Sequence, residues 1–134
     1  MDKKIISYII TLASFLVLGH LFIAVSEDSQ ITFASGLAIL PAGLLYSIFS
    51  FVNYKELRKK AYAGLLLHVA TYLLVNISFF IHASTIASFE GGLVSLEEGW
   101  YGPVVNMPLF WGIGLLAHTI YTWSRRGFED ICLD

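Results

Sequence analysis

The sequence predicts an all-α integral membrane protein, a four-helix bundle with up-down-up-down topology. Hydrophobic residues make up 57% of the 134 residues and charged residues only 13%, a composition outside the range of soluble domains of this size. Four apolar segments also come close to the roughly 20 residues that a transmembrane helix needs. The breaks between them are too short for a second domain, so we expect a single domain over residues 1–134. The predicted spans are residues 5–25, 31–52, 61–82 and 104–123.

The first apolar segment follows two lysines and therefore has the outline of a signal peptide. It is longer than the roughly 7–15 apolar residues of a signal peptide. We therefore interpret it as a membrane span.

The distribution of charge predicts the orientation. The loops 26–30 and 83–103 carry acidic residues and no basic ones. Because cytoplasmic loops are enriched in Lys and Arg, both termini and the loop 53–60 are predicted to be cytoplasmic, in the cytoplasmic membrane of a bacterium or archaeon. The basic residues that support this orientation are Lys3, Lys4, Lys55, Arg58, Lys59, Lys60, Arg125 and Arg126.

The connections predict how consecutive helices pack. Residues 26–30 and 53–60 are short turns, so the helices that they join are expected to be antiparallel neighbours. Residues 83–103 form a longer outer loop, which we interpret as a lid over the outer end of the bundle. Within it, Ser95 and Glu98 have capping-box spacing, which alternatively predicts a short interfacial helix.

The second span carries Gly36 and Gly43 on one face, with Pro41 between them. Small residues commonly let membrane helices approach closely, and we favour this interpretation. The alternative is clearance for a flat cofactor beside the backbone.

Four histidines lie within the predicted spans, where ionisable side chains usually have partners or a task. His68 and His82 fall on one stripe of the third helix together with Tyr72, Val75 and Phe79. The two histidines are about 21 Å apart along the helix axis, so one belongs to each leaflet.

Counting from the basic residues predicts an inner pair. His68 lies about 12 Å along the helix from Lys60, and His118 lies about 10.5 Å from Arg125. The similar depths predict that His68 and His118 face each other.

The outer pair is less well matched by the same count. His20 lies about 24 Å from Lys4, whereas His82 lies about 33 Å from Lys60. Counted from the outer acidic residues, however, the two histidines agree within about one residue, or about 1.5 Å. A second pair of His20 and His82 is therefore a further hypothesis.

Paired histidines on facing helices predict a cofactor site. Imidazole is an axial ligand of haem iron, and helix bundles hold cofactors between facing helices. We expect haem b bound by His68 and His118 and, if there are two haems, a second one bound by His20 and His82. A copper or zinc ion is an alternative, although two imidazoles are an incomplete set of ligands. For a single histidine, a hydrogen bond across helices is the plainer interpretation.

The expected haem site has a steric requirement. Packed helices lie about 8–10 Å apart, which is narrow for a porphyrin flanked by two imidazoles. Haem between sequence neighbours therefore requires splayed helices or a dimer partner, so a homodimer or larger membrane complex is an expected assembly.

Two resemblances bear on these residues. The spacing of His68 and His82 resembles that of the ligand helices of the cytochrome b family. Residues 55–124 also resemble the bacterial 2TM domain family, a helical hairpin with one HxxxYxxxN helix and one WGxGLxxH helix. Its motifs stand here as His68, Tyr72 and Asn76, followed by Trp111, Gly112, Gly114 and His118.

The second resemblance implies a hairpin whose relatives occur alone or fused to signalling modules, with no shared activity. It selects the inner pair and leaves His82 and His20 outside the family pattern. Tyr72 and Asn76 are polar groups that need partners in lipid. We expect Trp111 to cover a flat ligand, and the glycines Gly112 and Gly114 to admit another helix or a ring.

These features leave two functional hypotheses. The spans contain no Asp or Glu and no HExxH motif, which argues against a hydrolase. The net charge of −2 argues against nucleic acid as a partner. The first hypothesis is a small b-type haem protein for electron transfer or haem or redox sensing. The second is a cofactor-free scaffold or sensor subunit that docks a signalling or enzyme partner.

Overall fold

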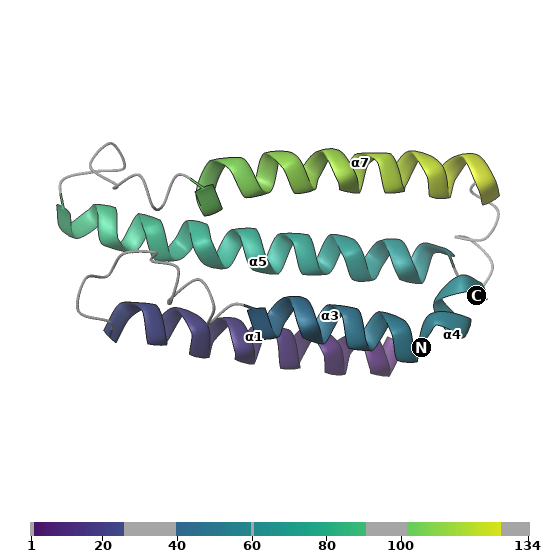
Figure 1. Cartoon of the computed structure of the whole chain (residues 1–134), viewed down its shortest axis with the longest axis horizontal. Helices are drawn as coiled ribbons and strands as arrows, with labels where there is room; N and C mark the ends of the chain where they lie inside the picture. Colours follow the sequence, from purple (N-terminus) through teal and green to yellow (C-terminus); the bar gives the residue numbers. More distant parts are fainter. Residues whose placement is uncertain (1, 26–39, 60, 91–101, 127–134) are drawn as a thin grey trace.

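The computed structural model of the chain consists of long helices that lie side by side, with α5 between α7 and α1 (Figure 1). It describes residues 2–25, 40–59, 61–90 and 102–126. The regular elements in these ranges are all helical, as predicted. They are α1 (Asp2–Val25), α3 (Leu40–Val52), α4 (Tyr54–Lys59), α5 (Ala61–Glu90), the π-helical turn η2 (Gly102–Asn106) and α7 (Met107–Arg126).

Three stretches are long and apolar enough to cross a membrane: Lys3–Val25, Tyr62–Thr85 and Gly102–Ser124. The fourth, α3, is apolar but has 13 residues, and the part of the predicted second span before it lies outside the described residues. Large apolar side chains point outward on these helices. Phe51, for example, is 85% exposed and Phe110 68% exposed. Exposing such apolar surfaces to water is unfavourable, whereas contact with the hydrocarbon of a bilayer is favourable.

Hydrogen-bonded pairs give the relative directions of α1 and α5. Tyr8 pairs with Thr71 at a separation of 63 residues, and His20 pairs with His82 at a separation of 62. A nearly constant separation means that α1 and α5 run parallel.

The other two contacts are antiparallel. Lys4 at the start of α1 meets Asn53 just after the end of α3, whereas Tyr8, further along α1, meets Phe49, which comes earlier in α3. On the other side of the molecule, His68 on α5 meets His118 on α7, while the later residue Tyr72 meets the earlier residue Pro108. The chain therefore alternates in direction from α1 to α3 to α5 to α7 (Figure 1).

The core lies between α1 and α5. On α1, the buried apolar residues Ile5, Tyr8, Leu12, Leu16 and Ile23 are three, four or seven positions apart, which places them on one face of the helix. On α5, Val75 and Phe79 are buried, as the predicted stripe requires. The buried cluster consists of Tyr8, Leu12, Leu16, Ile23, Ala42, Leu67, Val75, Phe79 and Ala83.

The predicted outer loop at residues 83–103 is wrong at both ends. Residues 83–90 continue α5, and residues 102 and 103 begin η2. The prediction ended the third helix where its hydropathy falls, but no helix-breaking residue occurs before Gly91 and Gly92. Ser95 and Glu98, with their predicted capping box, lie outside the described residues.

Two further segments differ from expectation. The inner turn 53–60 contains a short helix, α4, whose first turn begins with hydrogen bonds from the backbone N–H groups of Glu56 and Leu57 to the Asn53 carbonyl. Among the described residues Gly43 does not mark a close helix contact, because a Cβ atom built there would meet none of their atoms within 4 Å. Gly36 lies outside the described residues.

Candidate functional site

The structure brings His68 and His118 together at the interface of α5 and α7. Their Nδ1 atoms are 2.9 Å apart, and their ring centroids are 5.2 Å apart. The antiparallel packing of the two helices sets this contact, in agreement with the depth count. We call His68 and His118 the inner pair.

Trp111, two turns before His118 on the same face of α7, fixes the direction of this hydrogen bond. Its Nε1–H donates to His68 Nε2 at 2.7 Å. Since indole N–H is only a donor, His68 Nε2 carries no hydrogen and His68 must carry its hydrogen on Nδ1. His68 therefore donates to His118 Nδ1, and both ring nitrogens of His68 are bonded to protein groups. We call Trp111, His68 and His118 the inner clasp.

Tyr72 interlocks the same two helices one turn further along α5. Its hydroxyl donates to the Pro108 carbonyl at 3.1 Å, and its ring meets Trp111 edge to face at a centroid distance of 5.7 Å. A Cβ atom on Gly112 would lie 3.2 Å from the Tyr72 hydroxyl oxygen, so this glycine admits the ring. Gly114 has open space around its Cβ position, and no ring or helix approaches it within 4 Å.

Asn76 stands one turn beyond Tyr72 on α5 and is not part of the inner clasp. Its side-chain Nδ2 donates to the Tyr72 carbonyl at 2.7 Å. Its Oδ1 atom is buried and has no hydrogen-bond partner among the described residues. The amide therefore satisfies its donor inside its own helix and leaves its acceptor unpaired.

The outer pair also forms, between α1 and α5. His20 Nδ1 and His82 Nδ1 are 2.9 Å apart, and His20 Nε2 is 2.9 Å from the Ser78 hydroxyl oxygen. Because that hydroxyl donates its only hydrogen to the Val75 carbonyl, it accepts from His20 Nε2–H. His20 Nδ1 is then an acceptor, and His82 Nδ1–H donates to it. In both pairs the donor histidine stands on α5.

The outer pair borders a groove between α1 and α5. The groove has a volume of about 360 Å³, and apart from the two histidines and Ser78 its lining is apolar. Phe79 meets the edge of the His20 ring at a centroid distance of 4.8 Å. The outer pair thus lines a groove, whereas in the inner clasp Trp111 bonds the second ring nitrogen of His68.

The depth mismatch of the outer pair has a simple cause. The count set Lys4 and Lys60 at one level, but contacts between α1 and α5 join residues 62 or 63 positions apart. Lys4 is therefore level with residues 66 and 67 of α5. The helix α5 begins at Ala61, five or six residues before that level, so its start lies about 8–9 Å beyond the level of Lys4.

The paired histidines do not fit haem in the arrangement that the structure has. Bonds of about 2 Å from iron to each of two axial nitrogens place those nitrogens about 4 Å apart, with the macrocycle between them. Here the facing nitrogens are 2.9 Å apart in both pairs and bonded directly. Trp111 moreover bonds His68 instead of covering a flat ligand. Haem could enter only if a pair separated.

Several contacts were not predicted from the sequence. Tyr46 on α3 lies beside His68 at a centroid distance of 6.0 Å, and the Tyr8 hydroxyl is 2.7 Å from the Thr71 hydroxyl. The spacing of polar residues along each helix did not indicate these partners. They stand on other helices, and the sequence does not give the position of one helix relative to another along the membrane normal.

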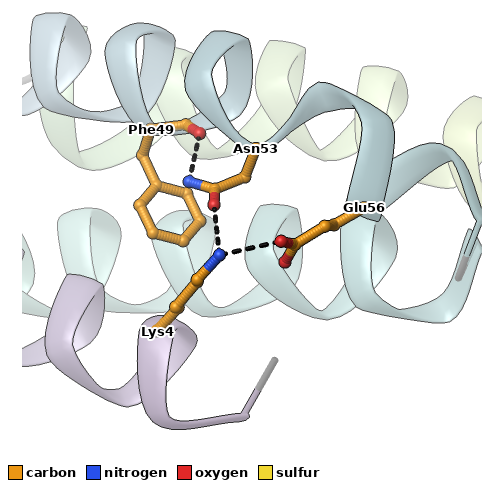
Figure 2. Close-up of polar contacts among 4 residues, drawn as sticks. All are labelled: Lys4, Phe49, Asn53 and Glu56. Atoms are coloured by element: carbon orange, nitrogen blue, oxygen red, sulfur yellow. Dashed lines mark hydrogen bonds and ion pairs between the residues drawn. The ribbon is translucent and has the colours of Figure 1, made fainter.

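A polar cluster at the basic end of the molecule was also missed. Figure 2 shows the Lys4 ammonium between Glu56 and Asn53, at 2.8 Å from the Glu56 carboxylate and 3.4 Å from the Asn53 side-chain oxygen. The Asn53 amide donates to the Phe49 carbonyl at 2.9 Å. These contacts join the start of α1 to the turn between α3 and α4.

Comparisons with known protein families, with curated proteins and with solved structures found no match to this chain.

Proposed function

We propose that the chain is a scaffold or sensor subunit of a membrane, without a cofactor of its own, that docks a signalling or enzyme partner. The observation that carries this proposal is the inner clasp. His68 uses both ring nitrogens on protein groups, and Trp111 and Tyr72 donate across the same interface. The motif residues thus form hydrogen bonds across the interface of α5 and α7, which supports a role in holding these two helices together.

The proposed topology is an up-down-up-down bundle with both termini and the α4 segment in the cytoplasm. The alternating helix directions and the three helices of membrane-spanning length support it. The basic residues at one end supply the orientation.

The resemblance to 2TM hairpins fits the same proposal. The positions that carry it include His68, Trp111, Gly112 and His118, and they form one interlocked contact between α5 and α7. We interpret the shared motif as a packing motif, which membrane proteins use to join helices through small and polar residues.

The proposed docking surface is α4. Asn53 and Lys4 tie this short helix to α1 and α3, so it is presented in a fixed position (Figure 2). Tyr54 and Lys55 on it are exposed. An anchored helix with outward aromatic and basic side chains suits a partner at the cytoplasmic surface.

Site-specific photo-crosslinking tests this docking in cells. A photoreactive residue at Lys55 should give one discrete adduct, whereas the same residue at Ser124, exposed at the same end of α7, should give none. Equal adduct patterns at both positions, or no adduct at Lys55, would contradict the docking surface.

Bis-histidine haem b remains the second candidate, and the presence of two histidine pairs at two depths favours it. A visible-range spectrum of protein purified from haem-replete cells separates the two proposals. The scaffold proposal expects no Soret band at full protein yield. A Soret band that His68→Ala and His118→Ala each abolish would establish a protein with one haem instead, whereas a Soret band that His68→Ala and His82→Ala each reduce by half would show two sites.

A further inference from the structure

A second groove opens between α1 and α3 at the basic end of the molecule, apart from both histidine pairs. It has a volume of about 370 Å³. Lys3, Lys4 and Asn53 stand at its mouth, and Thr11, Leu45 and Phe49 line it further along the helices. The groove therefore passes from a charged rim to an apolar interior.

The rim carries an excess of positive charge. Lys3 and Lys4 contribute two positive charges, and Glu56, which pairs with Lys4, contributes one negative charge, so one positive charge is left. Lys3 has no acidic partner among the described residues. The pairing with Glu56 and the contact with Asn53 hold the Lys4 ammonium in place (Figure 2), and Lys4 is one of the residues that line the groove.

The interior continues along α1 in the direction of the membrane centre. Lys3, Ser7 and Thr11 are spaced four residues apart and share one face of α1. From Lys3 to Thr11 this face extends for about 12 Å, which is enough to seat the first part of an acyl chain. Thr11 turns its hydroxyl to the Ser7 carbonyl at 2.8 Å, so its methyl group is left to line the groove.

We propose that this groove binds one phospholipid with a singly anionic head group, its phosphate at Lys3 and Lys4 and an acyl chain along Leu45 and Phe49. The net charge of the rim matches one phosphodiester, and basic pockets between transmembrane helices are known to hold anionic head groups. This proposal depends on insertion of the chain in a membrane and not on the role of the histidines.

Native mass spectrometry of the full chain in detergent tests the proposal, with phosphatidylglycerol and phosphatidylcholine of equal chain length as probes. We expect one phosphatidylglycerol adduct at concentrations where phosphatidylcholine gives little. Lys3→Gln should weaken that adduct about fivefold, the factor for one lysine beside an anionic lipid. The matched control is Lys55→Gln, an equal charge change at an exposed residue outside the groove.

Two outcomes would overturn the proposal. One is equal binding of the two lipids, and the other is an equal loss with Lys55→Gln and Lys3→Gln, since both indicate general surface charge. Thr11→Phe tests the interior separately, because it fills the groove and leaves both lysines in place. We expect it to abolish the lipid adduct, whereas glycerol phosphate alone, lacking acyl chains, should not bind to the wild type at the same concentration.

Discussion

The inner and outer pairs have the same distance between nitrogens, 2.9 Å, in different surroundings. Trp111 bonds the far side of the His68 ring, and Tyr72 locks the same interface one turn away. The outer pair has Ser78 on the His20 side and lines an open groove. The two pairs thus differ in the hydrogen bonds beside them, and we expect the inner pair, which shares its interface with the bonds of Trp111 and Tyr72, to contribute more to stability.

The largest expected effect is that of His68→Ala. It leaves the Trp111 N–H and the His118 Nδ1 atom without their partner, and unpaired groups at a helix interface in lipid are costly. We expect the free energy of unfolding to fall by about 2–3 kcal/mol. Denaturation in mixed detergent micelles measures it, and His68→Phe, which keeps a ring but no nitrogen, should lose a similar amount.

His82→Ala provides the comparison at the outer pair. It removes one hydrogen bond to His20, which keeps its bond to Ser78, so we expect a loss of about 1 kcal/mol. If His82→Ala costs as much as His68→Ala in the same measurement, then the hydrogen bond from Trp111 does not distinguish the two pairs.

Gly112→Ala tests the interlock beside the inner clasp. The new methyl group would press on the Tyr72 hydroxyl at 3.2 Å, and Tyr72 is held by Pro108 and Trp111. We expect a loss of about 1 kcal/mol, in the range for overpacking. Gly114→Ala is the control, because it has open space and should be neutral or stabilising by up to about 1 kcal/mol. Equal effects of the two substitutions would show that Tyr72 can shift freely.

The smallest effect is expected for Asn76→Leu. Asn76 donates only within its own helix and leaves a buried oxygen unpaired, so replacement by an apolar side chain should change the unfolding free energy by less than about 0.5 kcal/mol. A large loss of unfolding free energy in the same denaturation experiment would show that Asn76 contributes to the contact between α5 and α7.

Sequence reasoning identified the residues that meet but not the way they meet. The stripe of His68 and His82 on α5 and the depth match of His68 with His118 follow from helix periodicity and from the basic residues at one end. The direct hydrogen bonds did not follow, because the sequence does not state how closely two helices pack or that Trp111 turns its N–H toward His68. Haem binding by these pairs stays a prediction, and it would need a wider gap than the 2.9 Å between the paired nitrogens.

The boundaries of the elements show the same limit. Hydropathy ended the third helix at residue 82, whereas its hydrogen bonding continues to Glu90 because nothing in residues 83–90 breaks a helix. The level of the outer pair was misjudged because the start of α5 is displaced relative to the start of α1. Both errors concern where helices lie relative to one another, which local sequence patterns do not encode.

The stripe on α5 has a mechanical consequence. His68 and His82 stand on one face of a single rigid helix, and each is the donor in its pair. Rotation of α5 about its own axis would therefore displace both donors at once, one relative to α7 and one relative to α1. The two contacts, 14 residues apart along α5, are thus linked through one helix, and a rotation applied at either end of α5 would reach both of them.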